Sequence, residues 1–324
     1  LSASAYRDQY LLDQRNAIEL DTFQETNQRL GVLGLQYDHF WKGHLFTEGF
    51  DFQTEYLETE RLIDGDATRH RVAVFFQDQW DEIGTFPLQI LSGVRFDFDS
   101  WFGFYPTPKI ALRYDPTSQV RLRLVYGMGY RAPSFKEMFL YFENAGAGYV
   151  VEGNPDLGPE TSHSIQGEME VYLENFTLNA NLFHNRMQGL IMVASVDSPQ
   201  SDNLQFTYEN RAEAYTQGVE IRFTADVNSF LKVNGNYNLI DTKDLEQNRP
   251  LEGRAMHNGA AGLGVMLPTG TMMLWNSSFV GSRHFYFDVD GDNVEDDVST
   301  EPYAFVNFRL MQVASGYFQL FALN

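Results

Sequence analysis

The sequence predicts an all-β chain that crosses a membrane as an antiparallel, up-and-down β-barrel. Three observations lead to this prediction. Apolar and polar residues alternate along most of the chain, short and long connections follow one another between the alternating segments, and aromatic residues stand near segment ends. We expect about sixteen of these segments to be strands of the barrel wall.

Strict alternation over eight or more residues separates the predicted strands from helices. In "VEIRFTADV" (219–227), apolar residues occupy every second position, and Glu, Arg, Thr and Asp occupy the positions between them. "FTLNANLF" (176–183) and "LKVNGNYNL" (231–239) follow the same rule. Because no segment has a sustained apolar stripe of period 3.6, we expect no helices.

The predicted connections alternate in length from residue 115 onward. The short ones are 115–118, 174–175, 227–229, 268–270 and 314–316, and the long ones are 131–159, 187–205, 241–257 and 284–302. Alternate turns of a strand meander lie at opposite ends, so all the long loops are expected at one end. This arrangement is typical of outer-membrane barrels, which have short periplasmic turns and long extracellular loops.

A soluble β-sandwich would show the same alternation with its apolar side chains inside. It gives no reason for loops to be sorted by length, whereas a closed barrel satisfies every backbone amide in lipid. Aromatic residues near predicted strand ends fit the belts of a membrane interface. These residues are Tyr114, Tyr130, Tyr172, Tyr237, Trp275 and Tyr303. The polar sides of the strands carry both charges, among them Arg121, Arg123, Glu168, Glu170, Glu220 and Arg222, and are expected to line a water-filled lumen.

Composition narrows the classes of partner and chemistry. The chain has 324 residues, a formal net charge of −21 and no cysteine. The acidic balance argues against nucleic acid as a partner. The missing cysteines exclude disulfides and thiolate chemistry. No apolar run reaches the length of a membrane-spanning helix, and the first residues, "LSASAYRDQYLLDQ", do not read as a secretory signal peptide.

Two adjacent segments resemble the central motif of TonB-dependent outer-membrane receptors. They are "YGMGYRAPSFKEMF" and "GNPDLGPETSHSIQGEMEV", and the residues that carry the motif are Arg131, Ala132, Pro133, Asn154, Pro155 and Glu160. Further segments are similar to other strands of that family: "RVAVFFQDQW", "LQILSGVRFDFDS", "RPLEGRAMHNGAAGLG" and "FQLFALN". Independently of the resemblance, Pro133 is expected to end a strand because proline cannot donate a ladder hydrogen bond.

The resemblance implies a function and a place in the cell. Such receptors are active transporters in the outer membrane of Gram-negative bacteria, with a 22-stranded barrel around an N-terminal plug that engages the TonB-ExbB-ExbD system. Residues 1–324 would then be part of one barrel domain, without the plug, the first strands and the final strand. The pattern is most similar to the cobalamin, colicin I and siderophore receptor group. It implies a monomeric barrel in outer-membrane lipids that binds a ferric siderophore, cobalamin or similar chelate at its extracellular loops and imports it into the periplasm.

Enzymatic activity is not expected, because the seven histidines form no HExxH pair and no serine has a nucleophile-elbow context. The segment "FDVDGDNVEDDVS" offers Asp288, Asp290, Asp292 and Asp296 as oxygen ligands for calcium. Its spacing departs from the EF-hand loop, and a solvated acidic loop is the competing interpretation. No other cofactor is expected.

Aromatic residues in the long loops are candidates for substrate contact: Phe139, Tyr141, Phe142, Tyr149, Phe285 and Tyr286. They combine apolar faces with polar tips, which suits a planar or macrocyclic ligand. They would equally serve to pack the loops on one another. Residues 134–153 contain no histidine, which disfavours a haem receptor. A passive porin-like or structural barrel and a soluble β-rich binding module are the remaining alternatives.

Overall fold

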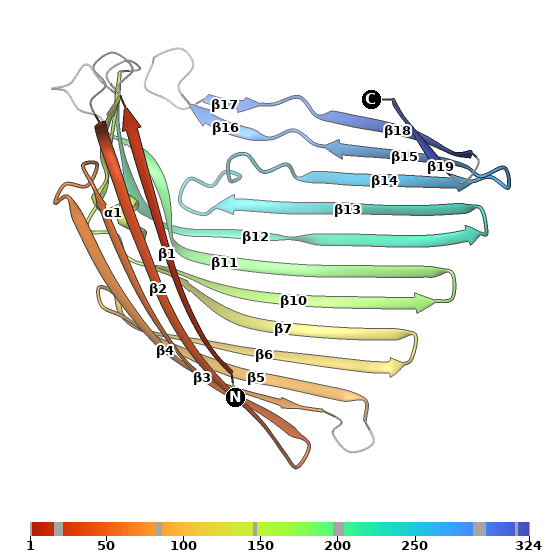
Figure 1. The fold of residues 1–324 in the computed structure, drawn as a ribbon, viewed down its shortest axis with the longest axis horizontal. Helices are drawn as coiled ribbons and strands as arrows, with labels where there is room; N and C mark the ends of the chain where they lie inside the picture. The colour runs from red at the N-terminus through yellow and green to blue at the C-terminus, as the bar shows by residue number, and fades with distance from the viewer. Residues whose placement is uncertain are drawn as a thin grey trace. The chain divides into compact units, whose positions relative to one another are not determined.

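The computed structural model describes residues 2–15, 22–81, 86–144, 148–196, 204–287, 296–314 and 317–323 (Figure 1). The strands are β1 (Ser2–Arg15), β2 (Thr22–Trp41), β3 (His44–Thr59), β4 (Asp66–Trp80), β5 (Leu88–Asp99), β6 (Gly103–Thr117), β7 (Val120–Arg131), β8 (Tyr141–Asn144), β9 (Tyr149–Glu152), β10 (Glu160–Leu173), β11 (Phe176–Val196), β12 (Leu204–Asn228), β13 (Leu231–Asp244), β14 (His257–Met266), β15 (Thr271–Val280), β16 (His284–Phe287), β17 (Asp296–Ser299), β18 (Tyr303–Ala314) and β19 (Tyr317–Leu323). Seventeen of them belong to one sheet, and β16 and β17 form a separate pair.

The all-β prediction is confirmed, with corrections inside the long connections. Four of the strands, β8, β9, β16 and β17, are four-residue strands that lie within loops, so the described chain has fifteen long strands in place of about sixteen. A short helix, α1 (Phe135–Phe139), was not predicted. It is only five residues long, too short to show a periodic apolar stripe. Among the described residues, no helix is long and apolar enough to cross a membrane.

Loop lengths follow the prediction over most of the chain. Beyond β6, connections of two to four residues (118–119, 174–175, 229–230, 267–270 and 315–316) alternate with longer ones (132–159, 197–203, 245–256 and 281–302). The predicted loop 187–205 shrinks to 197–203, because β11 and β12 extend into it. Before β6 the alternation is less regular, since the connection 81–87 is longer than 100–102.

The chain divides into two units. One comprises Leu1–Ala111, Tyr126–His163 and Met187–Glu213, and the other comprises Leu112–Val125, Ser164–Arg186 and Ala214–Asn324. In the first unit, β1 to β5 form an antiparallel meander. The β2–β3 connection is a two-residue turn in which Lys42 and Gly43 both have positive φ, as the favoured hairpin turns require.

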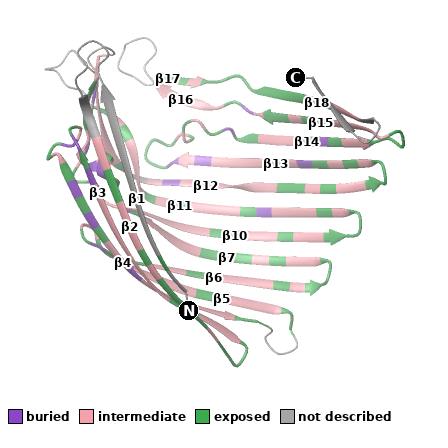
Figure 2. Cartoon of the chain, viewed as in Figure 1, coloured by how far each residue is buried: buried purple, intermediate pink, exposed green. Residues whose placement is uncertain are grey.

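Strands β3 to β5 have two chemically distinct faces. One, the polar face, carries acidic and basic side chains in register: Glu55 lies opposite Arg69, and Arg71 lies opposite Asp99. The other, the apolar face, carries rows such as Phe52–Val72–Phe98 and Phe50–Val74–Phe96. Buried residues lie on the polar side of β3 and β4, where Leu57, Thr59, Ala67 and Arg69 are covered by other parts of the unit (purple in Figure 2).

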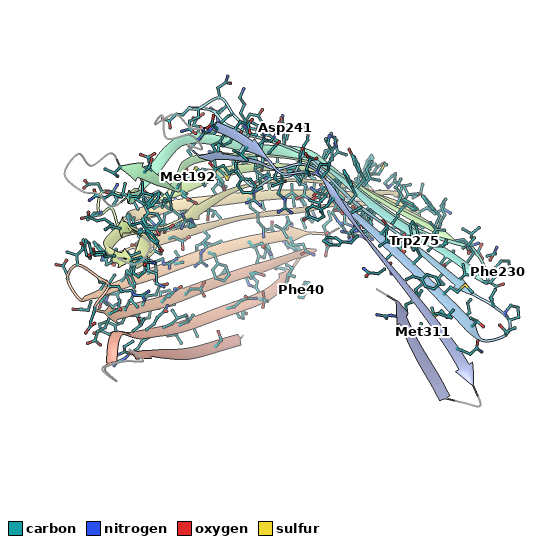
Figure 3. The ribbon with its side chains drawn as sticks, turned by 90° about the horizontal axis from the view of Figure 1, so that it is seen from above. Phe40, Met192, Phe230, Asp241, Trp275 and Met311 are labelled. Atoms are coloured by element: carbon teal, nitrogen blue, oxygen red, sulfur yellow. The ribbon has the colours of Figure 1, made fainter. Side chains whose placement is uncertain are left out.

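In the second unit, β12, β13, β14, β15, β18 and β19 pair antiparallel in chain order. One row across four of these strands is apolar: Val233, Leu263, Trp275 and Phe308 lie directly opposite one another. The adjacent row, Asn234, Gly262, Asn276 and Asn307, is polar or lacks a side chain. Trp275 projects from β15 (Figure 3), and its side chain is partly exposed on the apolar side. The predicted alternation is therefore realised as two faces of one sheet.

Candidate functional site

The long connection 132–159 begins with an ion cluster at the end of β7. Arg131, the last residue of β7, donates from Nε to Glu160 Oε2 (2.6 Å) and from Nη1 to Glu137 Oε1 (3.1 Å). Glu160 opens β10, and its Oε1 also accepts the backbone N–H of Ile191 at 2.8 Å. One arginine thus ties together the strand before the loop, the strand after it and the helix inside it.

Helix α1 is defined by a capping box. Ser134 is its N-cap, and the Ser134 hydroxyl accepts the N–H of Glu137, while the Glu137 carboxylate accepts the N–H of Ser134 at 2.7 Å. Burial alone would raise the pKa of Glu137, but the hydrogen bonds from Arg131 and Ser134 outweigh it and hold the pKa below its ordinary value. Ionised Glu137 therefore both caps the start of α1 and pairs with Arg131 in the ion cluster.

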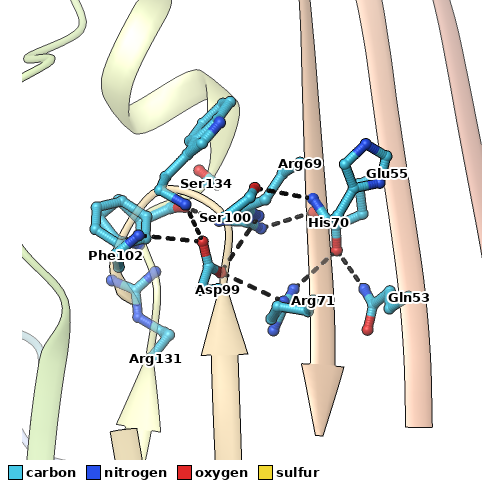
Figure 4. A network of polar contacts seen from close by, with 12 residues as sticks. Gln53, Glu55, Arg69, His70, Arg71, Asp99, Ser100, Phe102, Arg131 and Ser134 are labelled. Atoms are coloured by element: carbon cyan, nitrogen blue, oxygen red, sulfur yellow. Dashed lines mark hydrogen bonds and ion pairs between the residues drawn. The ribbon is translucent and has the colours of Figure 1, made fainter. Parts of the chain in front are cut away.

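A second cluster lies under the first residues of the loop, on the polar face of β3 to β5 (Figure 4). Arg69 donates from Nη1 to the carbonyl oxygen of Pro133 (2.7 Å) and from Nη2 to Glu55 (2.6 Å). Its side chain is 6% exposed. Asp99 accepts the N–H of Trp101 at 2.9 Å, and its other oxygen lies 3.7 Å from Nε of Arg71. The arginine that holds the loop is therefore itself held by carboxylates from two strands.

Apolar side chains cover the cluster around Arg69. Phe135 of α1 packs with Leu57, Leu62 and Ala67 in a buried core, to which Trp101 and Phe139 add partly buried rings. The Arg69 guanidinium carbon lies 5.3 Å from the centre of the Phe135 ring and 5.8 Å from that of Trp101. A guanidinium beside aromatic rings is attracted to them, and the rings shield its charge from water. The loop thus begins as a packed element that covers one end of the polar face.

The middle of the loop joins the β3–β4 connection. Leu140 pairs with Leu62 in an isolated bridge, Ile63 N–H donates to Phe139 O (3.0 Å), and Tyr141 N–H donates to Arg61 O (2.6 Å). Strands β8 and β9 then form a hairpin, and β9 runs parallel to the first residues of β12. A stretch predicted as an irregular loop of about thirty residues is therefore hydrogen-bonded to two neighbouring segments.

The end of the loop is fixed by two asparagines. Asn154 donates from its side chain to Tyr208 O (2.9 Å), and its own side-chain oxygen accepts the N–H of Asp156 (2.9 Å). Asn210 accepts the N–H of Gly158 (2.7 Å) and donates to the carbonyl oxygens of Gly158 and Gly189. Pro155 is exposed. These bonds fasten the re-entry into β10 to the beginning of β12.

A model of the TonB-dependent receptor-like β-barrel matches residues 2–324. The chain belongs to the TonB-dependent receptor family. Such receptors are outer-membrane proteins of Gram-negative bacteria and act as transporters. The chain is 28% identical over 130 residues to a vitamin B12 transporter, BtuB, of Vibrio vulnificus, which covers 40% of this chain and 19% of that protein. It is 26% identical over 227 residues to an iron-regulated outer membrane virulence protein of Vibrio cholerae, which covers 64% of this chain and 34% of that protein.

Solved structures show the same fold as this receptor chain. The ferric enterobactin receptor of Pseudomonas aeruginosa superimposes with a TM-score of 0.73 at 16% identity, covering 96% of this chain and 51% of that one. The siderophore receptor PirA of Acinetobacter baumannii gives 0.72 at 13% identity, covering 96% and 53%. The chain spans about half the length of these structures and less of the curated relatives it matches.

The receptor's predicted motif residues come together only in part. Arg131 and Glu160 share an ion pair, and Pro133 is fully buried with its carbonyl bonded to Arg69. Asn154 fastens the loop end. Arg69, Asp99 and Glu55 were not predicted, because 64 residues separate Arg69 from Pro133 and no local spacing reveals that contact. The Ser134–Glu137 capping box is a sequence signal that could have revealed α1.

The predicted substrate contacts in the first unit have different surroundings. Phe139 packs edge-on against Trp101, with ring centres 5.5 Å apart. Phe142 lies 4.9 Å from the guanidinium carbon of Arg61, and its ring centre lies 6.1 Å from that of Tyr149. Tyr141 is 48% exposed. Loop packing therefore accounts for the contacts of Phe139 and Phe142, whereas the Tyr141 side chain is exposed.

The other two candidates lie on β16, in the second unit. The guanidinium carbon of Arg249 lies 3.9 Å from the ring centre of Tyr286, and Gly253 N–H donates to His284 O. Burial raises the pKa of Tyr286, whose hydroxyl has no hydrogen-bond partner among the described residues. Of the predicted calcium ligands, Asp288, Asp290 and Asp292 lie outside the described residues, and Asp296 begins β17. Calcium binding therefore stays a prediction.

Proposed function

We propose that this protein is an active transporter of the outer membrane that takes up a metal chelate or cobalamin-like nutrient. The ligand binds at the extracellular loops, and the TonB-ExbB-ExbD system drives its import into the periplasm. The proposal assigns residues 1–324 to the barrel domain of such a receptor and gives it no enzymatic role. Membership of the receptor family and relatives named for vitamin B12 transport and iron regulation support this reading.

The observation that carries the proposal is the fixed loop on the polar face. A passive pore needs an open, wetted lumen, whereas here Pro133, Phe135 and Arg69 bring the longest connection down onto the face that is expected to line that lumen. Such a loop narrows the polar passage and offers a shaped surface near the strand ends. Ordered loops over a passage suit selective binding better than unselective diffusion.

We propose Tyr141 in the first unit and Tyr286 in the second as two separate candidates for ligand contact. Tyr141 is exposed at the start of the β8–β9 hairpin. The hydroxyl of Tyr286 is buried beside the guanidinium of Arg249 and has no hydrogen-bond partner among the described residues, and a ligand oxygen would supply one. A phenol next to a guanidinium suits the anionic oxygens of a ferric chelate. Each residue is held in place by the packing of its own loop.

Uptake by cells that express the complete protein tests the proposal. A Gram-negative host lacking its own receptors should gain TonB-dependent accumulation of one member of a panel of labelled ferric siderophores and cobalamin. Detergent-free fractionation should leave the protein in the outer membrane. Accumulation that is unchanged after loss of TonB, without saturable binding, would indicate a passive pore. Saturable uptake of haem alone would instead assign a haem receptor, as some haemoglobin-binding relatives suggest.

A further inference from the structure

The apolar face of β2 to β5 changes composition toward the β2–β3 turn. Successive rows across the four strands, ordered toward the turn, are Leu33–Phe52–Val72–Phe98, Leu35–Phe50–Val74–Phe96, Tyr37–Glu48–Phe76–Val94, His39–Phe46–Asp78–Ser92 and Trp41–His44–Trp80–Ile90. The first two rows are purely apolar. The last three mix aromatic rings with ionisable side chains, which is the composition of a membrane–water interface.

Aromatic and imidazole rings form a continuous stack in these mixed rows. The ring centres of Tyr37 and His39 are 5.3 Å apart, those of His39 and Phe46 are 5.2 Å apart, those of His44 and Phe46 are 5.5 Å apart, and those of His44 and Trp80 are 5.0 Å apart. At the turn, Nζ of Lys42 lies 4.7 Å from the centre of the exposed Trp41 ring. The stack therefore marks a fixed, rigid level at which the apolar rows give way to polar groups.

A groove of ≈ 500 Å³ opens beside this stack. Phe46, Phe76 and Val94 supply its apolar wall, and the polar residues of its lining include Glu48, Asp78, Ser92 and Lys109. Half of the Phe76 surface (51%) is exposed, so the groove is accessible from the apolar face. An open groove in which carboxylates lie beside aromatic rings offers contacts both for one acyl chain and for a polar head group.

Asp78 and Glu48, the two carboxylates of the groove, differ in their contacts within the chain. Asp78 contacts Nδ1 of His44 at 3.0 Å, which leaves its charge partly satisfied. Glu48 is exposed between Tyr37 and Phe76 and makes no hydrogen bond or ion pair with any described residue. A lone carboxylate at the boundary of an apolar surface requires a cation or water from outside the chain.

We propose that this groove binds a phospholipid whose head group carries a primary amine. One acyl chain lies against Phe46, Phe76 and Val94, and the ammonium group donates hydrogen bonds to Glu48. Anionic lipids are disfavoured because their phosphate would lie beside two carboxylates, Glu48 and Asp78, against one lysine that lines the groove, Lys109, in a chain of net charge −21. A quaternary ammonium has the same charge but no N–H donor, so it is expected to bind less well.

This inference rests on the membrane placement of the proposed function, and the two are tested separately. Membrane partition of the complete protein is measured first, because a protein that leaves the membrane without detergent fails the proposed function. Lipid retention is then measured by native mass spectrometry of the detergent-purified protein, with phosphatidylethanolamine, phosphatidylcholine and phosphatidylglycerol as equimolar probes. The expected result is retention of phosphatidylethanolamine over the other two by about fivefold or more, as one charge-assisted hydrogen bond would give.

Three variants separate the head-group contact from the groove. Glu48→Gln should abolish the preference while some retention of every lipid remains. Glu58→Gln, on the same strand and face but outside the groove, should leave the preference unchanged. Val94→Trp should fill the groove and lower retention of all three lipids. Equal retention of the three lipids by the unaltered protein, or a preference that survives Glu48→Gln, would overturn the head-group assignment, and full retention in Val94→Trp would overturn the groove.

Discussion

Arg69 donates a 2.7 Å hydrogen bond to the carbonyl oxygen of Pro133, across 64 residues of sequence. This bond joins the polar face of the sheet to the first turn of its longest connection. Arg69 is buried and also pairs with Glu55. The position of the loop therefore depends on the ion pairs of the sheet.

Arg69→Ala should lower the free energy of unfolding by about 2 kcal/mol or more, because it removes one of the two arginines that face the buried carboxylate of Asp99 and removes the anchor of Pro133. Urea unfolding measures the loss, and proteolysis within 135–157 should become faster. Arg95→Ala is the matched control, since its guanidinium pairs with Asp51 on the same face but is 39% exposed. Arg95→Ala should lower the free energy of unfolding by no more than about 1 kcal/mol. Equal losses in both variants would refute a special role for Arg69.

Gly153→Ala should displace the end of α1, because an added Cβ would lie 2.6 Å from the backbone carbon of Met138 and the backbone nitrogen of Phe139. Backbone atoms cannot move aside as a flexible side chain can, so we expect the free energy of unfolding to fall by about 2 kcal/mol. Gly167→Ala is the control, because its Cβ would meet open space. The midpoints of urea unfolding report both effects. A Gly153→Ala midpoint as high as that of the control would contradict the packing described for α1.

Order in the 132–159 loop should depend on pH through Glu137. The pKa of Glu137 is lowered in the folded state, so its ionised form stabilises the fold above its ordinary pKa of about 4.3. That contribution is lost as the pH falls through the lower, folded value. Hydrogen exchange of α1 between pH 3 and pH 7 checks this. Glu137→Gln should flatten the dependence, and Glu143→Gln, an exposed residue of β8, should not.

Tyr286→Phe should leave stability unchanged or raise it slightly, because the buried hydroxyl makes no hydrogen bond to a described residue. Tyr286→Ala should cost more, since it removes the ring over which Arg249 lies. If the hydroxyl contacts the ligand, Tyr286→Phe will weaken binding at unchanged stability. Thermal unfolding and fluorescence titration of the same samples separate the two effects. Unchanged affinity in Tyr286→Phe would remove its hydroxyl from the ligand site.

Calcium binding at the acidic segment predicts saturable heat in a calorimetric titration, with a dissociation constant of about 10⁻⁴ to 10⁻³ M. The triple variant Asp288→Asn, Asp290→Asn and Asp292→Asn should lose it. Asp64→Asn, an exposed aspartate elsewhere, should keep it. Heat that persists in the triple variant, or none in the unaltered protein, would support a solvated acidic loop instead.

The sequence allowed the strands and faces to be predicted because the two-residue period is local. Val233 and Asn234 face opposite sides in the sequence pattern and in the sheet. Periodicity could not reveal the contents of the long loops, because α1 is shorter than two helical turns and four-residue strands give too few alternations; the Ser134–Glu137 capping box was a local signal for α1 that went unused. Arg131 was found by its motif. Arg69 was not, since its importance lies in a contact between distant segments.

Strand β9 pairs in parallel with residues 204–207 of β12, while its partner β8 pairs antiparallel with it. The β8–β9 hairpin is consequently paired with the start of a 25-residue strand. If a force or a ligand displaces Tyr149, either Leu204 moves with it or the pairing between β9 and β12 breaks, one residue pair after another. Motion of the hairpin that preserves this pairing therefore carries residues 204–207 of β12 with it.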